Sequence, residues 1–208
     1  VVGANRDPDQ LDVCFDKFRS IRADGVLLLD AVESELSSTG HKIAQHNVPA
    51  VLVGCRSEEL SSVYVDNRIG GSDAMDYLID LHHDELFYFG TAKRSASTAD
   101  RLRGARESIA ATGMEPRFHL VETAVTEEGG YEAFKTLLAK SSHGTKAILA
   151  QNDHVALGVI RAARECGLRI PEDVAVIGFD DLSFSRFVDP PITTLRQPRL
   201  EMGKIAAQ

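Results

Sequence analysis

Residues 174–181, with the sequence VAVIGFDD, constrain the fold of this chain more than any other segment. A run of small, β-branched and aromatic residues ends there abruptly in two carboxylates. A strand that is apolar on both faces is typical of a parallel sheet covered by helices on both sides. Ligands of such sheets bind beyond the carboxyl ends of the strands. We therefore expect Asp180 and Asp181 to lie at an edge where a ligand can bind.

Strand and helix patterns alternate along the rest of the 208 residues. We expect strands at 1–4, 25–30, 50–54, 63–66, 86–90, 118–123, 147–151 and 174–180, and helices at 8–21, 33–47, 70–81, 99–111, 130–140 and 153–166. This alternation predicts βαβ units and a doubly wound α/β fold with parallel sheets. The number of strands favours two sheets, with a break near Asp66 and Asn67.

Composition and charge exclude several classes of protein. The formal net charge of −8 argues against nucleic-acid binding by this segment itself, because phosphate contacts need basic patches. No apolar run approaches the ~18 residues of a membrane span, and no signal-peptide pattern opens the chain. Cys14, Cys55 and Cys166 are odd in number and widely spaced. They favour reduced thiols of a cytoplasmic protein.

The motifs of common enzymes are missing from the sequence. It has no GxGxxG or GxxxxGK[ST] phosphate loop and no GxSxG nucleophile turn. Asp180 and Asp181 are adjacent, so their side chains diverge instead of sharing a proton. The neighbouring His82, His83 and Asp84 also diverge at a helix end, which favours a surface turn over a metal site. The sequence predicts a protein that is not an enzyme and has no cofactor.

Several longer segments carry a family resemblance. They are RADGVLLL, VYVDNRIGG, DRLRGARESI, AILAQNDHVALGVIRAARECGLRIPEDVAVIGFDD, PPITTLRQP and LEMGKIAA. In this order and spacing, the chain resembles the effector-binding domain of the LacI/GalR family of bacterial transcription regulators. The resemblance implies two lobes of the type I periplasmic-binding-protein fold, with an effector between them. The amino lobe would hold residues 1–66 and 197–208, and the carboxy lobe residues 67–196.

The same resemblance implies partners and missing parts. A helix-turn-helix headpiece would precede this chain and bind operator DNA, and the amino lobe would be incomplete as presented. Regulators of this family form homodimers, because two headpieces must match two operator half-sites. The alternative is a periplasmic sugar-binding protein of a transport system, which has the same fold. The ending PPITTLRQP and LEMGKIAA resembles regulators more than transport proteins.

Five positions match effector-contacting residues of the family: Arg101, Asn152, Asp180, Ser97 and Val125. A guanidinium offers five donors in a fixed fork, and a carboxylate accepts hydrogen bonds from two hydroxyls, so the set suits a polyol. Without the resemblance, Arg101 reads as a solvated helix-start residue, while Asn152 and Asp180 read as caps. Val125 falls where several relatives carry an aromatic platform. The expected effector is a sugar or a related polyol.

Other polar residues are expected to have structural roles. Asp66 and Asn67 match the family's first crossover between lobes, and Gln197 belongs to the second. Asp153 is expected to cap the helix that begins with HVALG, and Asp181 to hold the turn after the strand. Many sugar-responsive relatives carry an aspartate where this chain has Gly54. Together with Val125, this departure argues against the usual pyranose-binding mode.

Overall fold

The computed structural model describes residues 13–14, 16–18, 20–29, 48–54, 56–91, 95–140 and 144–208. The chain divides into two compact units. Unit 1 holds Val1–Val65, Ser95–Ser97 and Pro198–Gln208, and unit 2 holds Asp66–Arg94 and Thr98–Gln197. The elements expected at 1–4 and 33–47, and most of the helix expected at 8–21, lie outside the described residues.

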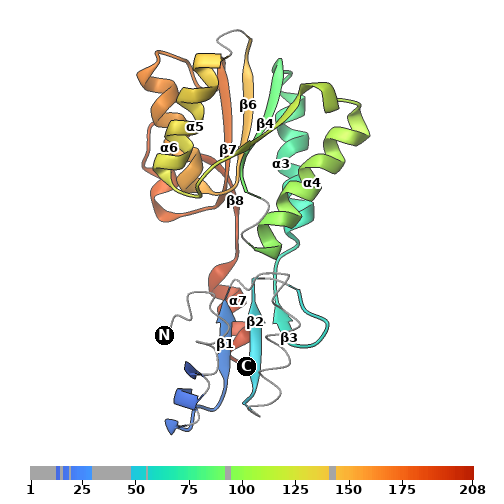
Figure 1. The fold of residues 1–208 in the computed structure, drawn as a ribbon, viewed down its shortest axis with the longest axis vertical. Coiled ribbons are helices and arrows are strands. Elements are labelled where there is room, and N and C mark those ends of the chain that lie inside the picture. The colour runs from blue at the N-terminus through green and yellow to red at the C-terminus, as the bar shows by residue number, and fades with distance from the viewer. Residues whose placement is uncertain are drawn as a thin grey trace. The chain divides into compact units, whose positions relative to one another are not determined.

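Unit 2 is built on a parallel sheet of five strands in the order β5-β4-β6-β7-β8. The strands are β4 (Glu85–Gly90), β5 (Phe118–Glu122), β6 (Lys146–Ala150), β7 (Val174–Asp180) and β8 (Thr193–Arg196). The helices are α3 (Asn67–Asp80), α4 (Ala96–Thr112), α5 (Glu127–Lys140) and α6 (Asp153–Glu165). Helices α3 and α4 cover one face of the sheet, and α5 and α6 cover the other (Figure 1). The predicted doubly wound α/β fold is confirmed.

The sheet of unit 2 is buried on both faces because its central strands are apolar between their charged end residues. Successive residues of β4 alternate between two cores, as the two-residue period of a strand requires. Phe87 and Phe89 pack into the core beneath α5 and α6. Leu86 and Tyr88 pack into the core beneath α3 and α4. Strand β7 has the bounds expected from the VAVIGFDD run.

Glycines allow each pair of covering helices to approach closely. A Cβ atom on Gly71 would lie 2.1 Å from the carbonyl oxygen of Arg101, and one on Gly104 only 1.9 Å from that of Arg68. The other pair repeats the arrangement, since a Cβ on Gly158 would lie 1.9 Å from the carbonyl oxygen of Glu127. Helix backbones therefore touch at these positions, and no larger residue fits without displacing a helix.

In unit 1, the described strands are β1 (Val26–Leu29), β2 (Ala50–Val53) and β3 (Ser61–Val63), which pair in parallel in that order. Helix α7 (Arg199–Ala206) belongs to the same unit. The strand expected at 63–66 is wrong at both ends, because β3 spans Ser61–Val63 and Asp66 caps α3 instead. Its Oδ1 atom accepts hydrogen bonds from the backbone N–H groups of Arg68 and Ile69, at 3.0 Å each. Helix α3 thus begins three residues before the expected position.

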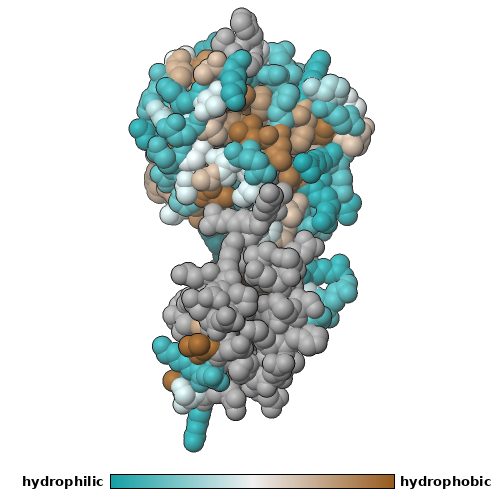
Figure 2. All heavy atoms as spheres, in the orientation of Figure 1, coloured by the Kyte–Doolittle hydropathy of each residue, from teal (hydrophilic) through white to brown (hydrophobic). Residues whose placement is uncertain are grey.

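The surface of unit 2 visible in Figure 2 is mainly hydrophilic, with small apolar patches among the polar residues. Among the helices of the described residues, none combines the length and apolar content that crossing a bilayer requires.

Helix α3 ends without the usual glycine. His82 is the residue directly after its C-cap, Leu81, and adopts the left-handed conformation (φ 57°) for which helices favour glycine at this position.

Candidate functional site

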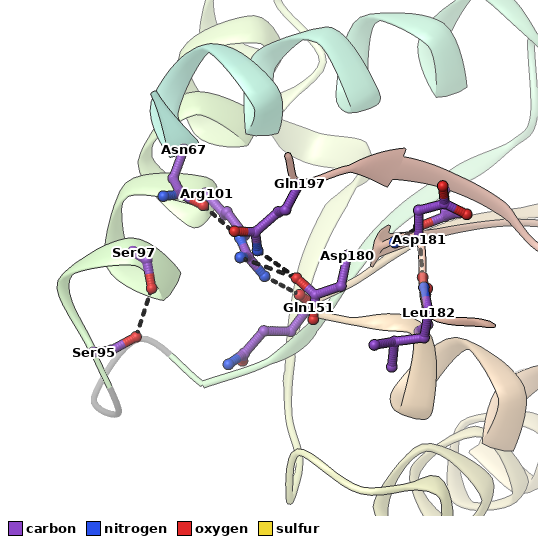
Figure 3. A network of polar contacts seen from close by, with 11 residues as sticks. Asn67, Ser95, Ser97, Arg101, Gln151, Asp180, Asp181, Leu182 and Gln197 are labelled. Atoms are coloured by element: carbon purple, nitrogen blue, oxygen red, sulfur yellow. Dashed lines mark hydrogen bonds and ion pairs between the residues drawn. The ribbon is translucent and has the colours of Figure 1, made fainter. Parts of the chain in front are cut away.

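Arg101 is the centre of a polar network at the carboxyl edge of the unit 2 sheet (Figure 3). It is only 5% exposed. Its Nε atom donates to Asn67 Oδ1 at 2.9 Å, and its Nη1 atom donates to the carbonyl oxygen of Gln151 at 2.7 Å. The Nη2 atom lies 3.5 Å from Asp180 Oδ1. The guanidinium carbon stands 3.7 Å from the centroid of the Phe179 ring, a cation–π contact.

The position of this network follows from the strand order. The connection after β4 leads to β5 on one side, and the connection after β6 leads to β7 on the other, so the winding changes direction between the adjacent strands β4 and β6. Such a switch point opens a crevice where open α/β sheets bind ligands. Arg101 comes from the helix after β4, Gln151 follows β6, and Asp180 ends β7. Segments far apart in sequence therefore deliver these groups to one edge.

Small residues on α3 make room for the arginine and its ring partner. The backbone of Arg101 rests against Gly71, where a Cβ would collide with its carbonyl oxygen. One residue earlier, a Cβ on Gly70 would lie 3.0 Å from the ring of Phe179. The guanidinium, the ring and the start of α3 are thus packed together. This packing fixes the direction in which the fork of N–H donors points.

Asp180 is the more open member of the pair, with a side chain 22% exposed. Its Oδ1 atom also accepts a hydrogen bond from Gln197 Nε2. The backbone at Asp180 has φ 116° and at Asp181 φ 51°, two consecutive non-glycine residues in an unfavourable region. Strain of this kind persists where surrounding contacts impose it and is concentrated at functional sites.

Asp181 turns away from this network and binds the neighbouring strand. Its Oδ2 atom accepts a hydrogen bond from Arg196 Nε at 2.5 Å. Its backbone N–H donates to Thr194 Oγ1 at 3.2 Å. The two adjacent carboxylates therefore diverge: Asp180 faces Arg101, and Asp181 ties the end of β7 to β8.

The expected division of roles between Asn152 and Asp153 is wrong in one respect. Asn152 caps α6, since its extended backbone lets Oδ1 accept from the N–H of Val155 at 2.9 Å. Asp153 is the first helical residue and is fully buried. Its oxygens accept from the Leu182 N–H at 2.7 Å, Ser185 Oγ at 2.7 Å and Thr194 Oγ1 at 2.6 Å. Asp153 therefore has a structural role through these three hydrogen bonds, and it does not cap the helix.

Ser97 and Val125 do not join the hydrogen bonds that link Arg101 and Asp180. Ser97 lies one turn before Arg101 in α4, groups with unit 1, and shares a hydrogen bond with Ser95 Oγ at 2.9 Å. Val125 lies between β5 and α5, where it lines a cavity of about 550 Å³. That cavity is also lined by Thr126, Glu127, Glu128, Tyr131, His154, Leu157, Gly158 and Arg161.

Comparison with known proteins identifies the family. Residues 75–208 match the periplasmic binding protein-like domain. The regulator CelR of Thermobifida fusca is 33% identical over 191 residues, which cover 89% of this chain and 55% of CelR. The repressor CytR of Escherichia coli K12 is 31% identical over 188 residues, covering 88% of this chain and 54% of CytR. The chain belongs to the LacI/GalR family.

A solved LacI-family structure supports the same assignment. The transcriptional regulator from Enterococcus faecalis V583, with bound ribose, superimposes with a TM-score of 0.75 at 27% identity. The match covers 92% of this chain and 70% of that structure. The LacI/GalR relatives are transcriptional regulators and not enzymes, so the prediction of a non-enzymatic protein is confirmed. The chain spans about half the length of the curated relatives it matches.

Sequence reasoning placed Asn67 and Gln197 at crossovers of a LacI/GalR domain, and the structure shows both bonded to the charged pair. It missed Gln151 and Phe179. The signal for Gln151 was its position directly after the apolar run of β6. Nothing in the sequence indicated a site role for Phe179, because aromatic residues within buried strands usually belong to the hydrophobic core.

Proposed function

We propose that this chain is the effector-binding domain of a transcription regulator that binds a sugar or related polyol through Arg101 and Asp180. One observation carries the proposal. A buried guanidinium, fixed by Asn67, Gln151 and Phe179, lies beside a carboxylate that stays partly open. A fixed fork of donors next to an acceptor suits adjacent hydroxyl groups, each of which both donates and accepts.

Asn152 supplies the third contact in this proposal. Its Oδ1 atom is engaged in capping α6, so its Nδ2 group would be the donor to a ligand hydroxyl. The ribose-bound regulator of Enterococcus faecalis supports a sugar as the ligand class. Ser97 and Val125 remain proposed contacts on the strength of the family resemblance alone.

The regulatory role is proposed on the relatives' identity. Effector binding favours one conformation by its differential affinity, and this shift alters operator binding by a helix-turn-helix headpiece. We propose a cytoplasmic homodimer, with units 1 and 2 as the amino and carboxy lobes. The alternative, a periplasmic binding protein for transport, has less support because CelR and CytR are regulators.

A thermal-shift screen of the full-length protein tests the proposal, with ribose, other pentoses, hexoses and nucleosides as probes. A sugar that binds the folded protein raises the melting temperature, and the rise grows with the ratio of sugar concentration to Kd. Asp180→Asn should weaken that binding at least tenfold, because a hydrogen bond to a charged acceptor contributes about 1.5–3 kcal/mol.

Asp181→Asn is the matched control for this screen. It changes the adjacent carboxylate in the same way, and asparagine also tolerates the positive φ that both positions share. We expect it to retain sugar binding. Equal stabilisation of both variants and the parent by the same sugar would sink the site assignment.

A further inference from the structure

Each of the two charged site residues, Arg101 and Asp180, is hydrogen-bonded to a residue near the point where the chain first enters or finally leaves unit 2. The chain first enters the unit at Asp66 and finally leaves it after Gln197, while Ser95–Ser97 between them group with unit 1. Asn67, one residue past the entry point, accepts a hydrogen bond from Arg101 through Oδ1. Gln197, at the exit point, donates from Nε2 to Asp180 Oδ1. Each charged residue thus has its own neutral amide partner at a crossover.

Asn67 cannot move independently of the backbone around it. It is the first residue of α3 and is buried. The N-terminal turn of α3 is fixed by the cap from Asp66 and by contact of Gly71 with the backbone of Arg101. A shift of the guanidinium therefore alters the contact that holds the start of α3.

Gln197 is also tied to strand pairing. Asp180 stands opposite Arg196 in the register of β7 and β8, so Gln197 follows immediately beyond the paired residues. Its side chain reaches back to the end of β7 and binds the carboxylate there (Figure 3). The next residue is Pro198, which has no N–H group and cannot extend the strand ladder. The side-chain amide is thus a link between the exit segment and the sheet edge.

A hydroxyl ligand would compete for these groups. The same oxygen, Asp180 Oδ1, serves both Arg101 and Gln197. A sugar hydroxyl that donates to this oxygen takes the geometric place of the Gln197 amide. A second hydroxyl that accepts from Arg101 would compete for the N–H groups that Arg101 donates to Asn67 and to the carbonyl oxygen of Gln151.

We infer that Gln197 and Asn67 are positioning residues that couple occupation of the Asp180–Arg101 pair to the two crossover segments. In this structure Gln197 donates to the Asp180 carboxylate and so links the exit segment to it. A ligand that binds Asp180 releases the amide, so the crossover gains freedom on binding. The nature of the ligand rests on the proposed function; the link between carboxylate and crossover does not.

Amide hydrogen exchange of the ligand-free full-length protein tests the link directly. The reporters are the backbone N–H groups of Gln197 and Met202, on either side of Pro198; the Met202 N–H donates to the carbonyl oxygen of Pro198 at 2.9 Å. Gln197→Ala should accelerate exchange at Met202, and Asp180→Asn at both reporters, about five- to tenfold, since the lost hydrogen bond involves a charged acceptor. The double variant should exchange no faster at Met202 than Asp180→Asn alone, because both changes remove one interaction.

Asp181→Asn serves again as the matched control. It weakens the neighbouring contact to Arg196, whose side chain is 78% exposed, so its effect on exchange should be below twofold. Unchanged exchange in Gln197→Ala or Asp180→Asn, or accelerations that multiply in the double variant, would overturn the inference. Asn67→Ala should accelerate exchange of the Arg68 and Ile69 amides by a similar factor.

Ribose titration separates this inference from the proposed function. Gln197→Ala should bind ribose about three- to tenfold more tightly than the parent, because the ligand no longer displaces the amide. Weaker binding would mean that Gln197 contacts the sugar directly, which overturns the competition. If the parent binds no sugar in the panel, the proposed function fails, and hydrogen exchange still decides whether the crossover is held by Asp180.

Discussion

The two faces of the unit 2 sheet have the same architecture but treat buried polar groups differently. Each face carries a helix pair in backbone contact at glycines. Beneath α5 and α6, Asp153 is fully buried and receives three hydrogen bonds from its own unit. On the α3–α4 face, Asp180 stays 22% exposed beside Arg101.

Unpaired polar atoms also concentrate in one segment. Among the described residues, the buried side-chain atoms without a hydrogen-bond partner are His83 Nδ1, Glu85 Oε2 and the Tyr88 hydroxyl. All three lie between the end of α3 and the end of β4. Of these residues, Tyr88 packs beneath α3 and α4, whereas Glu85 lies on the side of β4 that carries Phe87 and Phe89. The α3–α4 face thus retains the Tyr88 hydroxyl as a buried group without a partner, at a cost in stability, while Asp153 on the other face is satisfied.

The largest expected effect comes from replacing each carboxylate by the isosteric amide. Asp153→Asn should lower the free energy of unfolding by about 3 kcal/mol, because an amide NH2 group then faces hydrogen-bond donors in a dry site. Asp180→Asn should lower it by about 1 kcal/mol, since its partly exposed oxygen can still accept. Urea unfolding of both variants measures the difference. Equal losses of unfolding free energy in the two variants would mean that Asp153 and Asp180 do not differ in how much their hydrogen bonds stabilise the fold.

The glycine contacts offer a second comparison of the two faces. Gly71→Ala and Gly158→Ala should each destabilise by about 2 kcal/mol, because each methyl group collides with a facing backbone. Only Gly71→Ala should also weaken sugar binding, since it displaces Arg101. Sugar-induced thermal shifts of the two variants make this measurement.

Gly203→Ala is the control for these substitutions. Gly203 lies within α7, and nothing stands within 4 Å of the position of its Cβ. Alanine there should stabilise by up to about 1 kcal/mol through helix propensity alone. A loss of sugar binding in Gly158→Ala comparable to that in Gly71→Ala would show that the binding defect is not specific to the α3–α4 face.

The sequence predicted the fold well because periodicity is a local signal. The apolar run of β7 was assigned with its observed bounds, and the alternation predicted the parallel sheet. Strand β8 was not expected, because TTLR is short, half-buried and preceded by two prolines. The assignment of the α6 cap failed because asparagine and aspartate have similar capping preferences and only backbone geometry separates them.

The polar site was less accessible to sequence reasoning. Arg101, Asn67 and Gln197 were each named, but nothing local indicates that the first binds a residue 34 positions away. Such pairs depend on the crossing of α3 and α4 at Gly71, which is a property of the packed structure. The family resemblance identified Arg101 and Asp180 as candidates, but only the packed structure shows that they bind Asn67 and Gln197.

Tyr88→Phe should raise stability by about 1 kcal/mol. The hydroxyl is fully buried without a partner, and its burial raises the pKa of Tyr88, so it remains a protonated, unsatisfied group. Removing it relieves the desolvation cost while the ring keeps its packing against Met75 and Leu102. Denaturant midpoints of variant and parent measure the gain. A loss of stability would show that the hydroxyl has a partner in solution.

The smallest expected effect is a dependence of stability on pH through His83. Burial lowers the pKa of His83 below its ordinary value of 6.5, and Asp84 opposes this only in part. The unfolded chain then binds a proton more readily than the folded one, so stability falls as the pH drops below about 6.5. The contribution is fully present above that value and is lost as the pH falls through the folded pKa.

His83→Met tests this directly, because methionine fills a similar volume and does not titrate. The melting temperature of the parent should fall more between pH 7 and pH 5 than that of the variant, by a few degrees at most. The neighbouring Asp84 does not titrate in this window, since hydrogen bonds from Thr145 lower its pKa below the ordinary 3.8. Identical pH profiles would mean that His83 finds a partner for its Nδ1 atom, leaving Glu85 and Tyr88 as the unsatisfied residues of this segment.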